Sequence, residues 1–345
     1  MFCQPDDLAK GSIGSVLHAG WGFTAESVEY QAVGFGSHHW LATDTRGARL
    51  FVTVDDLSAK LRTVSDTTDA AFGRLARAFS AALSLRADAD LAFVVAPVPA
   101  ADGQVLRRLQ DRYSVVVHPF VAGSRAGDDG EFRTAEDRRS VPGLLAEMHG
   151  TRMSAPDTDD FVVPHREGLT MMMDQTGQRW DSGPYAERAR GLLAARAGEL
   201  QVLVAAYDGV AVRVAARPDR VVITHGEPHA GNVIVTVGGL VMVDWDTALL
   251  APPETDLWAL ARHDESMLRA YTAATGVDID QDALSLYRLW YDLAEIGGYL
   301  SLFRAPHRHS ADTAESWKNL RHFLQPAERW PALCQPGTAV LLAGA

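Results

Sequence analysis

Cysteine is nearly absent from this 345-residue sequence: the two that occur, Cys3 and Cys334, stand close to opposite ends. Two such residues cannot form the disulfide framework of a small secreted domain, so we expect a reducing compartment. No apolar run approaches the ~20 residues that a membrane helix needs. The first residues also lack the basic and apolar regions of a signal peptide. We therefore expect a cytoplasmic protein without a membrane partner.

Basic residues are in the minority. The sequence has 32 Lys and Arg against 44 Asp and Glu, which gives a formal net charge of −12 at pH 7. Nucleic-acid-binding proteins need a basic surface that neutralises phosphates, so we expect no nucleic-acid partner. A negative surface is compatible with a cationic small molecule, although acidic composition also serves solubility alone.

Apolar residues, in contrast, are sufficient for a large core. They make up 47% of the sequence, against 22% charged residues, which is ordinary for a globular protein. A chain of 345 residues exceeds one average domain, so we expect either two lobes or one domain with a large second layer.

The first part of the chain has the pattern of a small mixed lobe. β-branched and aromatic segments predict strands separated by turns such as GFGS at 34–37. The predicted strands are 27–33, 38–45, 49–56, 91–99 and 111–123. Apolar residues at helical spacing predict one inserted helix over 69–88.

The second part of the chain becomes mainly helical after a glycine-rich hinge at 123–133. We therefore place a nucleotide-binding lobe at 1–122 and a catalytic and acceptor-binding lobe at 123–345. Two short apolar segments, 221–226 and 239–246, are predicted as buried hairpin strands. A long helix is predicted at 283–303, and its leucine stripe predicts a core-facing side.

The polar motif THGEPHAGN, residues 224–232, allows three interpretations. His225, Glu227 and His229 are all competent zinc ligands, but a helical zinc motif needs its histidines on one helix face. Pro228 would break that helix, and no further cysteine or histidine cluster completes four ligands. A plain polar turn accounts for the glycine, proline and asparagine by backbone preference alone.

The third interpretation is a phosphoryl-transfer loop. His225, Glu227 and Asn232 have the spacing of a catalytic loop in which an acid accepts the hydroxyl proton and an asparagine holds magnesium. Asp244 in VDWD follows an apolar segment and precedes an aromatic residue, as a metal-binding aspartate does. Amide and carboxylate oxygens suit Mg²⁺ on phosphate. We expect His225 to shape the loop rather than to act as the base.

The sequence H-G-E-P-H-A-G-N, followed by V-D-W-D and A-P-P-E-x-D-L-W, resembles the aminoglycoside phosphotransferase (antibiotic kinase) family. Within it, the chain is most similar to the spectinomycin-phosphotransferase-like branch. The resemblance implies an α+β, two-lobed protein-kinase-like fold. The N-lobe would be a small five-stranded antiparallel sheet with one helix, and the C-lobe would be mainly helical.

The same resemblance implies an activity. The protein would be a Mg²⁺-dependent O-phosphotransferase that moves the γ-phosphate of ATP or GTP to a hydroxyl of a small molecule. The expected acceptor is an antibiotic of the aminoglycoside, aminocyclitol or nucleoside type, and its modification would give resistance. The partners would be the nucleotide and the acceptor, and the protein would be a monomer or a dimer.

Site residues follow from the resemblance position by position. Glu227 stands where the family has its catalytic aspartate, with His225 beside it. Asn232 and Asp244 stand where the family has its magnesium ligands, and Asp246 lies close enough to assist.

The nucleotide would meet a glycine-containing turn, the third strand and the segment after the fifth strand. The residues implied there are Gly36, Ser37, His38, His39, Thr53, His118 and Phe120. The acceptor would meet the C-terminal helices and the catalytic loop. The residues implied there are Asp292, Glu295, Tyr299 and His229. For the helix residues, an ordinary solvated face is the alternative.

Two departures from the family pattern stand out. The acid is Glu227, one methylene longer than aspartate. The third strand carries Thr53 where a phosphate-binding lysine is expected, and residues 56–90 contain no glutamate that could pair with such a lysine. The phosphate charge would then fall to Lys60, Arg62, His38 or His39, or these would be ordinary surface groups.

The departures keep other functions open. The protein could be a pseudokinase-like small-molecule-binding or regulatory protein without turnover. It could also be a kinase of an endogenous sugar or amino alcohol. The choice between ATP and GTP is open as well, because hinge backbone groups would contact the purine.

Overall fold

The computed structural model describes residues 1–128, 131–153, 156–261 and 265–334. It divides into two compact units. The first consists of residues 1–60, 67–159 and 219–280, and the second of residues 61–66, 160–218 and 281–345. The first unit includes residues on both sides of residue 123, where the boundary between the lobes was predicted. That boundary stays a prediction.

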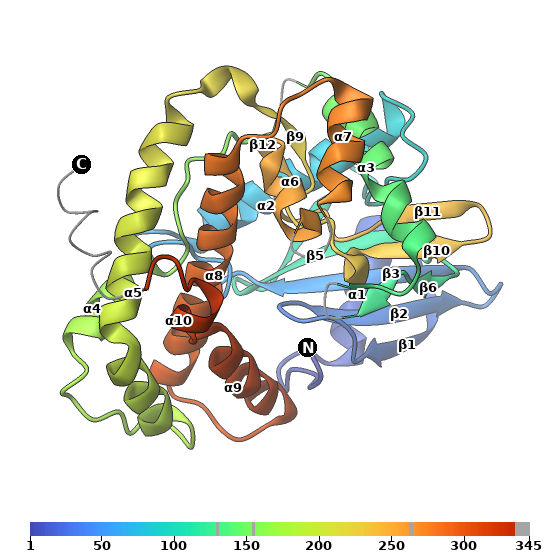
Figure 1. Ribbon diagram of the computed structural model, residues 1–345. Helices are drawn as coiled ribbons and strands as arrows, with labels where there is room; N and C mark the ends of the chain where they lie inside the picture. The colour runs from blue at the N-terminus through green and yellow to red at the C-terminus, as the bar shows by residue number, and fades with distance from the viewer. Residues whose placement is uncertain (129–130, 154–155, 262–264, 335–345) are drawn as a thin grey trace. The chain divides into compact units, whose positions relative to one another are not determined.

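A five-stranded antiparallel sheet lies in the first unit, with the order β1-β2-β3-β5-β4 (Figure 1). Its strands are β1 (Ala25–Gln31), β2 (His38–Asp44), β3 (Arg49–Asp56), β4 (Leu106–Leu109) and β5 (Tyr113–Pro119). The helix α2 (Thr68–Ala87) is inserted between β3 and β4, and Thr67 caps it by accepting a hydrogen bond from the Ala70 nitrogen. The predicted α+β class, strand count and inserted helix are confirmed.

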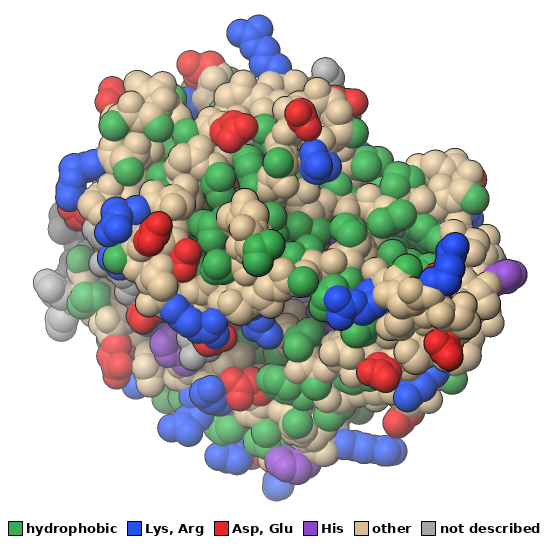
Figure 2. Space-filling view, turned by 90° about the vertical axis from the view of Figure 1, so that its right-hand side faces the viewer, with side chains coloured by type: hydrophobic (Ala, Val, Ile, Leu, Met, Phe, Trp, Pro, Cys, Tyr) green, Lys and Arg blue, Asp and Glu red, His purple; other side chains and the backbone are tan. Residues whose placement is uncertain are grey.

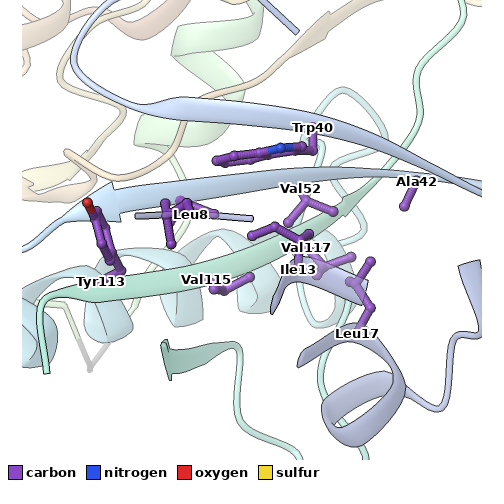
Figure 3. Packing of buried hydrophobic residues seen from close by; sticks show 10 residues of the cluster. Leu8, Ile13, Leu17, Trp40, Ala42, Val52, Tyr113, Val115 and Val117 are labelled. Carbon is purple, nitrogen blue, oxygen red and sulfur yellow. The ribbon is translucent and has the colours of Figure 1, made fainter. Parts of the chain in front are cut away.

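The core of this lobe lies between the sheet and α1 (Lys10–Trp21), a helix that the sequence patterns did not predict. Figure 3 shows Ile13 and Leu17 of α1 beside Val52 and Val117 of the central strands. All four side chains are buried, together with Trp40 of β2. The segment of α1 contains Gly11 and Gly14, and glycine lowers helix propensity, so its local pattern was weak.

The fourth strand lies elsewhere than predicted. The apolar segment 91–99 is a connection that begins with a turn at 92–93, and the strand that pairs with β5 on this side is Leu106–Leu109. Segment 91–99 contacts two other parts of the unit: the Met242 nitrogen donates to the Phe93 carbonyl over 2.7 Å, and the Val98 nitrogen donates to the Val117 carbonyl of β5 over 2.7 Å. Pro97 and Pro99 cannot donate to a strand ladder, which keeps the segment out of the sheet.

The remainder of the first unit holds helices and three small sheets. The helices are α3 (Ala135–His149), α6 (Glu254–Ala261) and α7 (Ser266–Thr275), with the 3₁₀ turns η1 (Pro218–Arg220) and η2 (Ala230–Asn232). The short strands are β6 (Ser124–Arg125), β7 (Gly127–Asp128), β8 (Glu131–Phe132), β9 (Val222–Thr224), β10 (Val233–Thr236), β11 (Gly239–Met242) and β12 (Leu249–Ala251). The predicted hinge 123–133 thus contains β6 to β8, and its residues 129–130 lie outside the described residues.

The predicted hairpin between 221–226 and 239–246 is wrong in its pairing. Strand β9 pairs with β12, and β11 pairs with β10, which was not predicted. Each segment contains a short strand, but the two strands do not pair with each other. The motif therefore lies between two separate sheets, the two-stranded β12-β9 and the three-stranded β11-β10-β6.

The second unit is helical. Its helices are α4 (Arg166–Asp174), α5 (Ala186–Ala215), α8 (Gln281–Arg304), α9 (Ala311–Phe323) and α10 (Pro326–Arg329). Helix α8 packs against α5, α4 and α9. Helices α8 and α5 lie side by side in Figure 1. The predicted core stripe of α8 is confirmed, because Leu286, Leu289, Leu293, Ile296 and Leu300 are all buried.

Charged side chains of both signs are interspersed on the face drawn in Figure 2. Many arginines pair with nearby carboxylates, as Arg213 does with Asp282. Among the described residues, no helix combines the length and the apolar character that a membrane span requires.

Candidate active site

The loop that follows β9 is shaped by His225, whose side chain is fully buried. Its Nε2 donates to the Val243 carbonyl over 2.9 Å, and its Nδ1 accepts from the Glu227 nitrogen over 3.3 Å. Burial lowers the pKa of His225 below its usual 6.5, and this effect outweighs the opposite effect of the Asp256 carboxylate. The neutral ring therefore joins the loop to the end of β11, which is a scaffolding role.

Asp256, near the start of α6, holds the same loop from the other side. Its carboxylate is fully buried and accepts from the backbone nitrogens of His225 over 2.9 Å and Gly226 over 2.6 Å. His149 of α3 contributes a further bond, with Nε2 3.0 Å from Asp256 Oδ2, and its Nδ1 contacts the Tyr271 hydroxyl. A buried carboxylate is stable only when such donors surround it.

Gly226 is the point where the loop turns. Its φ is +93°, a conformation that side chains with a Cβ rarely adopt, and an added Cβ would lie 2.7 Å from Thr247 Oγ1. That hydroxyl donates to the His225 carbonyl over 2.8 Å. Position 226 therefore requires glycine both for its backbone conformation and for the lack of space beside Thr247.

Glu227 and Asn232 are in contact within the loop. The Asn232 amide nitrogen donates to the Glu227 carbonyl over 3.0 Å. The Asn232 carbonyl accepts from the Val243 nitrogen over 3.0 Å, which brings the residue to the start of the VDWD segment. This use of Nδ2 leaves Oδ1 of Asn232 as the amide atom suited to a cation.

Two carboxylates, Asp244 and Asp246, follow β11. The pKa of Asp244 is raised well above its usual range by desolvation and by the negative charges of Asp246, Glu227 and Asp55, with Lys60 acting in the opposite direction. Asp244 also has a φ of +68°, a costly conformation that surrounding structure must enforce. A concentration of negative charge of this kind is relieved by a cation.

Magnesium fits the oxygen atoms of this site. No group of three or more His, Cys, Asp or Glu side chains in the described part of the chain forms a complete metal cage. Mg²⁺ does not need such a cage, because it keeps several waters and is shared with substrate phosphates. Asn232, Asp244 and Asp246 supply the carboxylate and amide oxygens that it prefers.

The strands of the large sheet contribute the residues predicted for the nucleotide. Ser37, in the turn that precedes β2, donates its hydroxyl to Asp55 over 2.6 Å, and Gly36 beside it has a φ of +91°. Thr53 Oγ1 lies 3.1 Å from His39 Nδ1 on the neighbouring strand. The His38 ring lies 3.1 Å from the Tyr30 hydroxyl.

His118 and Phe120 lie at the end of β5. Burial lowers the pKa of His118 to about 4, and its Nε2 has no hydrogen-bond partner among the described residues. The guanidinium of Arg49 lies over the Phe120 ring, 3.8 Å from its centroid. A buried ring nitrogen without a partner is a group that a ligand could satisfy.

The residues predicted for the acceptor lie in different surroundings. Asp292 of α8 is buried and pairs with Arg329, and it also accepts from Trp330 Nε1 over 2.8 Å. An acceptor would have to compete with these bonds for its carboxylate. Tyr299 accepts from the Asn319 amide over 3.2 Å, and burial raises the pKa of Glu295.

His229, the fourth predicted acceptor residue, shapes the loop 225–232. Its Nδ1 accepts from the Gly231 nitrogen over 3.1 Å at the start of η2. Burial lowers its pKa to about 4, so the ring is neutral near pH 7. The loop belongs to the first unit, and Asp292, Glu295 and Tyr299 belong to the second. Their place in one acceptor site stays a prediction.

Three residues of this site were not assigned a role from the sequence. Asp256 lies in the A-P-P-E-x-D-L-W motif, so that motif contained the signal although no role was attached to it. Asp55 and His149 carried no local signal, because their partners are distant in the sequence.

A model of the phosphotransferase enzyme family matches residues 31–290 of this chain. Protein StrN of Streptomyces griseus is 32% identical over 245 residues, which cover 67% of this chain and 72% of StrN. The chain belongs to the phosphotransferase enzyme family. The resemblance stated from the motifs is thereby confirmed, and the protein is a phosphotransferase.

Solved structures show the fold of this phosphotransferase. A spectinomycin phosphotransferase bound to ADP and spectinomycin has a TM-score of 0.69 and 16% identity, covering 99% of each chain. An amicoumacin kinase bound to the nucleotide analogue AMP-PNP has a TM-score of 0.59 and 12% identity, covering 97% of each chain. The predicted kinase-like fold is confirmed by these matches.

Proposed function

We propose that this phosphotransferase moves the γ-phosphate of ATP or GTP to a hydroxyl of a small molecule, with Mg²⁺ as the metal. The observation that carries the proposal is the loop 225–232. His225, Gly226 and the buried Asp256 fix its backbone, and Glu227 and Asn232 lie on it next to Asp244 and Asp246. A loop that only formed a turn would need none of these carboxylates.

The residues divide the chemistry among them. The acceptor hydroxyl oxygen forms a bond to the γ-phosphorus, the bond to the β,γ-bridging oxygen breaks, and the nucleoside diphosphate leaves. Glu227 orients the hydroxyl and accepts its proton. Asn232, Asp244 and Asp246 would hold Mg²⁺, which neutralises charge on the phosphate oxygens.

The nucleotide would lie against the sheet. The turn with Gly36 and Ser37, together with His38, His39 and Thr53, would face the phosphates. The buried Nε2 of His118 and the segment with Phe120 would lie near the purine.

We infer that the acceptor is an antibiotic of the aminocyclitol, aminoglycoside or nucleoside type, and that its phosphorylation gives resistance. The support is the likeness to a spectinomycin phosphotransferase and to an amicoumacin kinase. Glu295 and Tyr299, with Asp292 and His229, are the proposed acceptor residues. The acidic composition is compatible with an acceptor that carries amines.

A transfer assay tests the proposal. The protein would be incubated with Mg-ATP or Mg-GTP and, separately, with spectinomycin, streptomycin, a capuramycin-type nucleoside, choline and a simple sugar. Mass spectrometry would detect the phosphorylated acceptor. The Glu227→Ala variant, prepared in parallel, controls for contaminating kinases. We expect one antibiotic class to be modified by wild-type protein alone.

The absence of a lysine at Thr53 favours one second function, a pseudokinase-like binder. Such a protein would bind the acceptor tightly in calorimetry and phosphorylate none of the panel, and that result would overturn the proposed activity. Turnover of choline or of the sugar, with no antibiotic modified, would instead assign an endogenous alcohol as the acceptor.

A further inference from the structure

The centre of the large sheet lacks the positive charge that a polyphosphate requires. Thr53, at the position where the family pattern has lysine, is hydrogen-bonded to His39. Burial and neighbouring positive charges lower the pKa of His39 to about 3, so this ring is neutral near pH 7. Neither residue can neutralise a phosphate group.

A carboxylate takes a position on the same strand face. Asp55 stands two residues after Thr53, and alternate residues of a strand point to the same side. Its side chain is 1% exposed and accepts the Ser37 hydroxyl over 2.6 Å. A carboxylate at this depth needs a cation or several donors.

Lys60 supplies that cation from the segment after β3. Its Nζ lies 3.2 Å from Asp55 Oδ1 and 2.7 Å from Asp246 Oδ2. The ammonium thus connects the sheet to the VDWD segment, 186 positions away in the sequence. Two carboxylates, one from each segment, therefore lie in direct contact with the Lys60 ammonium.

Arg62, the other basic side chain predicted as a phosphate ligand in this segment, bonds to different groups. Arg62 pairs with Asp160 and donates to the Val162 carbonyl, all within the second unit. An ammonium has three N–H donors, and the described residues account for two acceptors, Asp55 and Asp246.

We propose that Lys60 is the phosphate-binding lysine of this protein, moved from the strand interior to the segment after β3 and anchored by Asp55. Asp55 then takes the part that a helix glutamate takes in kinases with the usual ion pair. The pair is reversed in direction: the strand carries the carboxylate, and the segment that follows carries the lysine. This inference rests on the proposed nucleotide-dependent function.

Chemical labelling tests the inference on unaltered protein. The sequence contains only three lysines, Lys10, Lys60 and Lys318, and the first and last are exposed. An acyl-phosphate derivative of ATP or ADP transfers its acyl group to an amine that lies beside the polyphosphate. We expect Lys60 to be acylated, and excess ATP or GTP to prevent it, as read by peptide mass spectrometry.

Nucleotide binding is measured calorimetrically in the same preparation. If neither ATP nor GTP binds, the proposed function fails, and the inference fails with it. If a nucleotide binds but Lys60 gains no label that the nucleotide blocks, the inference alone is overturned. Nucleotide-blocked label on Lys10 or Lys318 would overturn it in the same way.

A variant series separates phosphate binding from a purely structural ion pair. Lys60→Met should weaken triphosphate binding about tenfold to a hundredfold, the usual worth of a hydrogen bond to a charged group. Binding of the corresponding nucleoside should stay at the wild-type level. Lys60→Arg should restore part of the triphosphate affinity, and Lys318→Met serves as the matched control.

A structural ion pair predicts a different pattern. Lys60→Met would then lower the thermal unfolding midpoint and weaken nucleoside and triphosphate binding equally, or weaken neither. Either result would overturn the proposal. Should Lys60→Met fail to fold, the labelling of wild-type protein decides alone.

Discussion

The carboxylate of Asp256 lies 2.6 Å from the backbone nitrogen of Gly226 and holds the turn that loop 225–232 makes at this glycine. The same carboxylate accepts from the nitrogen of His225. The loop therefore has its backbone fixed by a residue outside it, on a helix thirty positions further along the chain.

Replacing Asp256 by asparagine is expected to lower the free energy of unfolding by about 1–3 kcal/mol. The amide keeps one oxygen acceptor but turns an N–H donor toward backbone N–H groups, so one of them loses its partner. Urea unfolding followed by circular dichroism would measure the loss. The control is Asp219→Asn, at an exposed position in η1. Equal unfolding midpoints for the two variants would contradict this role of Asp256.

Glu227→Gln is expected to lower kcat by about a hundredfold or more, the usual contribution of a general base. The amide keeps the length of the side chain but cannot accept the hydroxyl proton. Nucleotide affinity, measured by calorimetry, should stay unchanged. Glu227→Asp keeps the carboxylate one methylene further back and should retain more activity than the glutamine variant. Near-normal turnover in Glu227→Gln would remove the assignment of this residue as the base.

The residues that the sequence could predict are those that lie close together in it. Glu227, Asn232 and Asp244 fall within one short stretch, and their spacing alone indicated phosphoryl transfer. The structure adds that the Asn232 side chain contacts the Glu227 carbonyl and that the Asn232 backbone contacts Val243. The roles of these residues as base and metal ligands stay predictions.

The features that could not be predicted depend on distant contacts. Segment 91–99 has the composition of a strand, but its backbone bonds to Met242 and, at Val98, to Val117 instead of forming a strand of the sheet. From the sequence, Lys60 was one of four candidates for the phosphate charge, and a surface group was the alternative. Its contact with Asp246 could not be predicted, because the two residues lie 186 positions apart. Local pattern gives the type of many elements, whereas only the assembled chain gives their partners.

His39 predicts an acid-sensitive stability. Its pKa in the folded protein is about 3, below the ordinary value of 6.5. The unfolded chain therefore binds the proton first, and stability is lost as the pH falls below about 6.5 until the folded pKa is reached. Above that window the contribution is fully present.

Urea unfolding of wild-type protein and of His39→Gln at pH 7.5 and pH 5 would measure this effect. The variant should lose less stability than wild type between the two pH values. His18→Gln, at an exposed position, is the control and should follow wild type. An identical loss in wild type and His39→Gln would show that another group is responsible.

Asp292 and Arg329 form a buried ion pair. Variants of this pair test whether Asp292 has a structural role or binds the acceptor. The two side chains are 1% and 9% exposed. Replacing Asp292 alone by leucine leaves the guanidinium without its carboxylate and is expected to cost about 3–5 kcal/mol of unfolding free energy. Replacing both residues by leucine removes the uncompensated charge, so the double variant should be more stable than the single one.

Acceptor kinetics complete this comparison. If Asp292 serves only to pair with Arg329 of α10, the variant Arg329→Leu should lower the free energy of unfolding as Asp292→Leu does. The acceptor KM should then rise only in those variants whose free energy of unfolding falls. If the carboxylate binds the acceptor, Asp292→Leu should raise the acceptor KM at an unchanged nucleotide KM, and the double variant should raise it equally. Because the double variant restores stability but not the carboxylate, only a direct acceptor contact predicts a high KM in a stable protein.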